Sequence, residues 1–234
     1  MKKIFGLLLV LTLALSCMLV SCNTEDINAK SEGVMTYAEY AAAELDTKVV
    51  IEAYVQAKQI YNTEYKNTTL YLQDGEGAYF VYRLACTESE YDAIKVGNKV
   101  KVTGYKSEWS GEVEITDATI SVVSGNYVAK AFDATSIAGD EKALLARQNQ
   151  LVAFKNAEIT EIEFKNGEPG NDIYVTAKIG TATIEFCLES DLVTPGSDVY
   201  KTVEALKAGD KVDIECFLYW YNGANPHIIG VTAK

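Results

Sequence analysis

The chain has 234 residues, which is enough for one large or two small domains. A hydrophobic content of 48% is ordinary for a globular protein and excludes the disordered class. A formal net charge of −12 disfavours a nucleic-acid partner, because affinity for nucleic acid rests largely on Lys and Arg contacts to phosphate.

The N-terminus has the layout of a secretory signal. Lys2 and Lys3 form a short basic region, and residues 4–20 form an apolar run. The run ends in residues 19–22, Leu-Val-Ser-Cys, which resemble the lipobox of bacterial lipoproteins. That resemblance implies removal of residues 1–21 as a signal peptide and attachment of a lipid to Cys22, so that the protein has the membrane as a partner through this lipid.

Two alternatives to this processing stay open. An uncleaved membrane anchor would need about 20 apolar residues, and the run is slightly shorter. Cys17 is a competing lipidation site, but Ala14 stands where a lipobox usually has Leu.

A flexible tether is expected over residues 22–35, which are polar and without periodicity beyond Cys22. Asn23 is not the Asp that favours retention in the inner membrane of familiar Gram-negative bacteria. Glu25 and Asp26 resemble the acidic export signal of Bacteroidetes surface lipoproteins. We therefore expect an outer-membrane lipoprotein, either periplasmic or exposed at the cell surface.

Residues 36–127 are predicted to form the first domain. Thr36 and Glu39 fit a capping box at the start of a short helix over residues 37–45. Period-2 alternation predicts a strand from residue 48. Further strands are predicted at residues 69–73, 78–84, 99–105 and 112–116, with a short helical link between the third and fourth.

Five strands with this helical link follow the order of an OB-fold barrel. Residues 71–75 (Tyr-Leu-Gln-Asp-Gly), residues 79–82 (Tyr-Phe-Val-Tyr) and residues 96–100 (Val-Gly-Asn-Lys-Val) resemble the OB-fold domains of Bacteroidetes lipoproteins. Asn98 stands where that pattern usually has Asp. The resemblance implies an OB fold over about residues 36–123 and implies little about function.

A motif that occurs twice indicates a second copy of this unit. Residues 94–105 and 206–217 align so that Lys95, Gly97, Lys99 and Val100 recur as Lys207, Gly209, Lys211 and Val212. The same offset carries Trp109 onto Tyr221. We predict an all-β protein of two tandem OB-fold-like five-stranded barrels, each preceded by a short helix. A linker with a short helix occupies residues 128–148, and the second domain occupies residues 149–234.

No catalytic constellation is visible in the sequence. The single histidine, His227, disfavours a His-cluster metal site and a Ser-His-Asp triad. Cys86, Cys187 and Cys216 are expected to be buried or inert thiols. No glycine-rich phosphate loop opens a helix, so no nucleotide cofactor is expected. We predict no enzyme activity, no catalytic residue, no metal and no cofactor.

Aromatic residues are the remaining candidates for a site. OB folds bind ligands on the face of the second and third strands and on the loops beside it. Five aromatics are predicted to share that face or border it, and they form the candidate ligand site: Tyr54, Tyr71, Phe80, Tyr82 and Trp109. The alternative is that these rings pack at a hairpin or a domain interface.

The function predicted from the sequence is a binding module of the cell envelope, whose ligand is a glycan or a partner protein. A structural or assembly subunit of an envelope complex is the alternative. Single-stranded nucleic-acid binding is a weaker one, since it rests on fold analogy alone.

Overall fold

The computed structural model describes residues 26–234. The expected signal peptide and Cys22 lie outside the described residues. Within residues 26–234, no helix is both long enough and apolar enough to cross a membrane.

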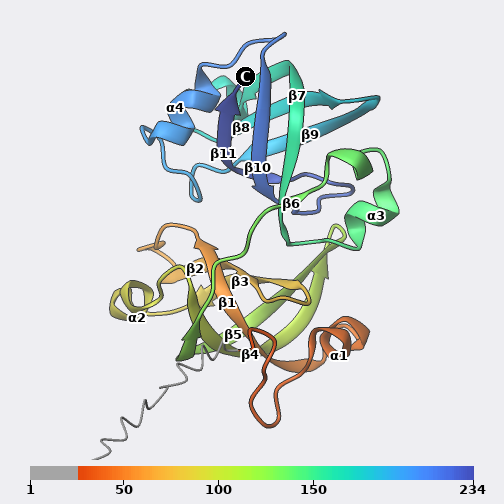
Figure 1. Ribbon diagram of the computed structural model, residues 1–234. Helices are drawn as coiled ribbons and strands as arrows, with labels where there is room; N and C mark the ends of the chain where they lie inside the picture. The colour runs from red at the N-terminus through yellow and green to blue at the C-terminus, as the bar shows by residue number, and fades with distance from the viewer. Residues whose placement is uncertain (1–25) are drawn as a thin grey trace, which may run out of the picture.

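The protein is mostly β, with short helices in the connections (Figure 1). The helices are α1 (Tyr37–Ala42), α2 (Glu88–Ala93), α3 (Glu141–Leu145) and α4 (Asp198–Glu204), with 3-10 turns η1 (Thr135–Ile137) and η2 (Lys165–Gly167). The strands are β1 (Lys48–Lys58), β2 (Asn67–Gln73), β3 (Ala78–Ala85), β4 (Asn98–Trp109), β5 (Glu112–Asn126), β6 (Phe132–Asp133), β7 (Leu151–Phe164), β8 (Ile173–Ile179), β9 (Ala182–Leu188), β10 (Lys211–Phe217) and β11 (His227–Ala233).

The first five strands form a closed barrel in the order β1-β2-β3-β5-β4. All neighbours are antiparallel except β3 and β5, which are parallel, and β4 closes the ring by pairing along β1. Alternation along β1 sends Val49, Ile51, Ala53 and Val55 into the core with Leu70 and Leu72 of β2. The predicted period-2 pattern is therefore the inward face of the barrel.

The second barrel repeats this order with β7-β8-β9-β11-β10, and pairing of β10 with β7 closes it. The β9 and β11 strands are again the parallel pair, and β6 adds a short parallel strand beside β7. Figure 1 shows the two barrels stacked one on the other, joined by the chain that leads into β6. The prediction of two tandem OB-like barrels, each preceded by a short helix, is confirmed.

The repeated motif forms the same turn twice. Gly97 and Gly209 both have positive φ, at 90° and 96°, where a side chain would be strained. Each donates its amide to the first strand of its own barrel, Gly97 to Val55 and Gly209 to Ile159, both at 2.8 Å. The motif therefore fixes where the fourth strand enters each barrel.

Side-chain caps begin the helices, and the capping box predicted at Thr36 and Glu39 is present. Thr36 and Glu39 form the capping box of α1, and Asp140 and Ser197 cap α3 and α4. Helix α1 ends at Ala42, earlier than the predicted residue 45. The carbonyls of Tyr40 and Ala41, and that of the C-cap residue Ala43, accept hydrogen bonds from the Lys106 ammonium.

Candidate ligand cleft between the barrels

The predicted aromatic face of the first barrel is mostly covered by the second barrel. Tyr71 and Phe80 point outward from β2 and β3, as expected, but they are only 1% and 3% exposed. They pack with Leu151 and Phe217 of the second barrel, and the Tyr71 ring stacks on Phe217 with 4.5 Å between centroids. These two residues are therefore interface residues and offer no free surface to a ligand.

Tyr54 is also withdrawn from solvent, at 2% exposure. Its ring meets Tyr127 edge-on at 5.4 Å, where the chain leaves the first barrel. The Lys99 ammonium lies 5.9 Å from the ring centroid. Tyr54 thus packs beside the start of the interbarrel segment.

Tyr82 and Trp109 remain accessible, and both line a cleft between the barrels. The cleft has a volume of about 580 Å³, within the range of about 300–1,000 Å³ that is typical of ligand sites. Tyr82 is half-buried and comes from β3, and Trp109 is 54% exposed at the end of β4. Tyr219, which follows β10, faces the same cleft from the second barrel.

Two aromatic residues from the second barrel extend this site. Tyr221, 49% exposed, lies with its ring centroid 5.1 Å from that of Trp109. A hydrogen bond of 2.7 Å from the Asn222 amide to the Ser110 carbonyl joins the two loops that carry them. The sequence-based candidate set omitted Tyr219 and Tyr221, although the repeat offset aligns Trp109 with Tyr221.

The rest of the cleft is polar. Its charged lining side chains are Arg83, Glu114, Lys165, Asp172, Glu189 and Asp191. Burial opposes the charged form of Asp172, but Lys165 at 2.9 Å and two hydrogen bonds from Ser190 lower its pKa below the ordinary value. Partial burial, together with the nearby Glu189 and Asp172, raises the pKa of the largely exposed Asp191. Carboxylates outnumber cations, so the cleft suits a polyanion poorly.

At the inner wall of the cleft, a hydrogen-bond network joins the barrels. The Tyr71 hydroxyl donates to Glu189 at 3.1 Å and lies 2.7 Å from Nδ1 of His227. His227 Nδ1 is 3.1 Å from the same carboxylate oxygen, which also accepts from Gln59 at 2.8 Å. Burial would raise the pKa of Glu189, but His227 and these donors lower it. His227 is thus buried and stacked on Tyr219, and its role is to bond the two barrels together at their interface.

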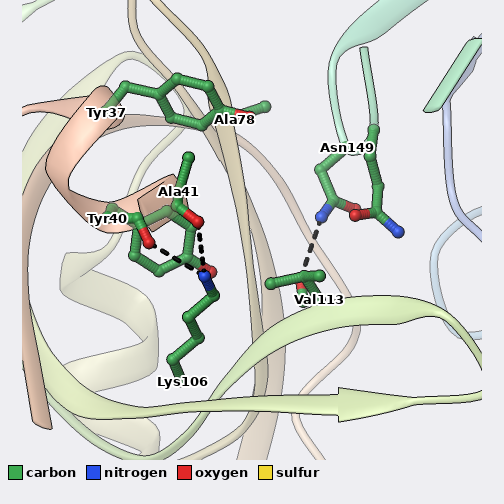
Figure 2. Close-up of a pocket in the computed structure, with 8 residues that line it drawn as sticks. Tyr37, Tyr40, Ala41, Ala78, Lys106, Val113 and Asn149 are labelled. Atoms are coloured by element: carbon green, nitrogen blue, oxygen red, sulfur yellow. Dashed lines mark hydrogen bonds between the residues drawn. The ribbon is translucent and has the colours of Figure 1, made fainter. Parts of the chain in front are cut away.

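A second, smaller cavity of about 140 Å³ lies beneath α1 (Figure 2). Figure 2 shows Lys106 reaching the carbonyls of Tyr40 and Ala41, while Asn149 of the second barrel bonds the Val113 carbonyl. Burial lowers the pKa of Lys106. The Tyr40 hydroxyl and the Asn149 Oδ1 are buried without a hydrogen-bond partner among the described residues. This volume has room for a few water molecules, which commonly satisfy such groups.

Glu112 is fully buried where the barrels meet. Its Oε2 accepts from the backbone amide of Trp220 in the second barrel at 2.9 Å, and from Gln148, which precedes β7, at 3.2 Å. Its Oε1 has no partner within the described part of the chain. Burial raises the pKa of Glu112 to about 8, against these hydrogen bonds, which favour the charged form. The raised pKa thus favours the protonated form of Glu112.

The cysteines and the metal-ligand residues add no further site. Cys86, Cys187 and Cys216 are free and buried within residues 26–234, as predicted for the thiols of the mature domains. In the same part of the chain, no group of three or more His, Cys, Asp or Glu side chains is arranged to hold a metal ion.

Neither a protein-family model nor a curated protein matches the chain. Similar solved structures include the Ifi202 HINa domain in complex with 20-base-pair double-stranded DNA, at 14% identity over 80% of this chain and 98% of that one, with a TM-score of 0.37. A murine DNA-binding protein bound to double-stranded DNA is 12% identical over 79% of this chain and 96% of that one, with a TM-score of 0.39. Likeness at this level says nothing about what this chain binds.

Proposed function

We propose that this chain is a non-catalytic binding module of the bacterial cell envelope, anchored through a lipid on Cys22, whose ligand is a glycan held in the interbarrel cleft. One observation carries the proposal. An exposed aromatic pair, Trp109 and Tyr221, stands beside a cleft of about 580 Å³ that Trp109 itself lines, and the rest of that lining is mostly polar.

The chemistry of the cleft supports a sugar over a polyanion. Aromatic faces stack on sugar rings and on bases alike, so the rings do not decide between them. The polar side chains around them offer many hydrogen-bonding groups, among them Asn62, Asn67 and Asp191. The excess of carboxylates repels phosphate, which disfavours nucleic acid.

The proposal is tested on a glycan array with the full mature chain, in parallel with single- and double-stranded DNA. Trp109→Ala and Tyr221→Ala should each weaken glycan binding about tenfold or more, because stacking on one aromatic ring contributes roughly 1–3 kcal/mol for bases. Tyr105→Ala removes a similarly exposed ring that does not line the cleft, so it should leave binding unchanged.

Three outcomes would contradict the glycan proposal. Retention of DNA, lost in Trp109→Ala, would move the function to nucleic-acid binding. Binding of no ligand, together with concentration-dependent self-assembly, would favour the structural subunit. Equal loss of glycan binding in Tyr105→Ala would show that the cleft is not the site.

A further inference from the structure

Glu114 is a buried carboxylate on the wall of the interbarrel cleft. It lies on β5, two residues after Glu112 and on the same face of the strand, paired in register with Phe80 of β3 and Ser107 of β4. The second barrel covers Glu112 completely, whereas Glu114 lies at the cleft and is 6% exposed. Tyr82 and Tyr219 line the same cleft.

This carboxylate has no protein partner among the described residues, and its oxygens open onto the cleft. Among residues 26–234, no hydrogen bond or ion pair to the Glu114 carboxylate is present. The positive charge that acts on Glu114 is that of Arg83, whose guanidinium lies 4.9 Å from the centroid of the Tyr82 ring. Burial raises the pKa of Glu114, and Arg83 lowers it only in part. A cationic donor that enters the cleft at this point would form a charge-assisted hydrogen bond with this free carboxylate.

The other acids of the cleft are already engaged or open to water. Asp172 is paired with Lys165, and Glu189 is held by His227, Gln59 and Tyr71. Asp191 is exposed to solvent. Glu114 is therefore the acid in the cleft that combines deep burial with free hydrogen-bonding capacity.

We propose that the Glu114 recess is a subsite for a protonated amine on the ligand, so that the cleft prefers amino sugars with a free amine over their N-acetylated forms. This inference rests on the proposed glycan function. Sugar rings would lie against the aromatic side chains of the cleft, and the amine of one ring would donate to the Glu114 carboxylate. An N-acetyl group at the same position carries no charge and adds bulk.

Chitosan and chitin oligomers of equal length provide the matched probes, because they differ only in whether the amine of each ring is free or acetylated. Calorimetry on the mature chain, at mildly acidic pH where the amine is charged, should show the chitosan oligomer binding about tenfold or more tighter, the gain expected of a charge-assisted hydrogen bond. Glu114→Gln keeps the shape of the side chain and should abolish this preference while chitin binding persists. Glu161→Gln, an exposed acid on β7, should keep the preference.

Proton release on binding is a second measurement, and it would not change if Glu114 had only a structural role. An ammonium group beside Glu114 favours its carboxylate form, so chitosan binding should release protons, detected as a dependence of the heat on buffer ionisation enthalpy. Glu114→Gln should lose this dependence.

Equal affinity for the two oligomers, or a preference that survives Glu114→Gln, would overturn the amine subsite and leave the glycan function standing. Failure of both oligomers to bind would overturn it as well, and a blank glycan array would then remove the function on which it rests. Oligolysine binding as tightly as chitosan, and losing that affinity in Glu114→Gln, would assign the recess to a basic peptide and overturn the amino-sugar proposal.

Discussion

The chemistry of Glu112 depends on the contact between the barrels. In the unfolded chain its pKa is near 4.5, and burial raises it to about 8 in the folded protein. Between these values the folded state holds a proton that the unfolded state has released. Stability from this group is thus complete below about pH 4.5 and is lost as pH rises toward 8, by about 1.4 kcal/mol per pH unit.

Glu112→Gln should remove this dependence, because the amide is neutral at every pH. In urea unfolding at about pH 5 and about pH 9, the wild type should lose more stability than the variant between the two conditions, by up to a few kcal/mol. Glu161→Gln, an exposed acid on β7, controls for the loss of one carboxylate. Identical pH profiles for the wild type and Glu112→Gln would contradict the buried protonated state.

Tyr71 contributes to the interface through both its ring and its hydroxyl. Tyr71→Phe keeps the stack on Phe217 but removes the hydroxyl that contacts Glu189 and His227. We expect a loss of about 1–3 kcal/mol in the free energy of unfolding, because buried polar groups lose their partner. Tyr65→Phe, at a ring 66% exposed, should change stability little. Equal stability of the two variants would show that the network is energetically neutral.

The loops that follow β4 and β10 are equivalent in the two repeats, but the glycines they carry have different surroundings. Gly111 has φ of +89°, and a Cβ there would lie 2.7 Å from Cδ1 of Trp220. Its repeat counterpart Gly223 has φ of +148° and open space around it. Both positions strain an alanine, but only Gly111→Ala also presses against the other barrel.

Gly111→Ala should therefore cost about 1–3 kcal/mol more stability than Gly223→Ala, the usual range for overpacking. Urea midpoints of the two variants measure the difference directly. The clash also separates the loops that carry Trp109 and Tyr221, so glycan affinity should fall in Gly111→Ala alone. Equal effects of both substitutions on stability would mean that the loop around Gly111 moves away from Trp220 without a loss of stability.

The elements of the fold could be predicted because their signals are local. The alternation of apolar residues along residues 49–57 predicts a strand without any knowledge of the neighbouring strands. The pair Thr36 and Glu39 predicts the start of a helix from a segment of only four residues. The fifth strand was predicted too short, since β5 continues to Asn126 along β4 with polar and half-exposed residues that lack a clear pattern. Edge segments of this kind are specified by their partner strand more than by their own periodicity.

The candidate site could be predicted only in part, because docking of one barrel on the other is not encoded in local spacing. The outward orientation of Tyr71 and Phe80 was predicted correctly from the alternation along their strands. No residue close to them in the sequence indicates that Phe217 of the second barrel packs over them. Tyr82 and Trp109 remain open at the edge of the same interface. Tyr221 could have been added from the repeat offset, whereas Glu114 could not be distinguished among 33 acidic residues.

At the scale of the whole molecule, the sequence predicts attachment to the membrane. The lipobox predicts that Cys22 carries the lipid, and residues 26–234 then extend from that anchor. Metabolic labelling with a fatty-acid probe should be lost in Cys22→Ala and retained in Cys17→Ala. Retention in Cys22→Ala with loss in Cys17→Ala would move the site of lipidation.

The interface predicts that the two barrels unfold as one unit. Tyr71 and Phe80 are outward residues of the first barrel, and separation of the barrels would expose both to water. Phe186→Ala opens a cavity in the core of the second barrel only, at a cost of about 3–5 kcal/mol. If the barrels are coupled, hydrogen exchange should accelerate in β2 and β3 of the first barrel as well as in β8 and β9.

The matched control for this coupling is Val128→Ala, an exposed apolar residue between the barrels, which should leave exchange unchanged in both. Acceleration confined to the second barrel in Phe186→Ala would show that the first barrel holds its fold without its neighbour. The aromatic face of Tyr71 and Phe80 would then tolerate exposure, and the cleft could widen by separation of the barrels. Uniform acceleration instead means that the cleft keeps its geometry as long as the protein is folded, so that Trp109, Tyr221 and Glu114 act as a fixed set.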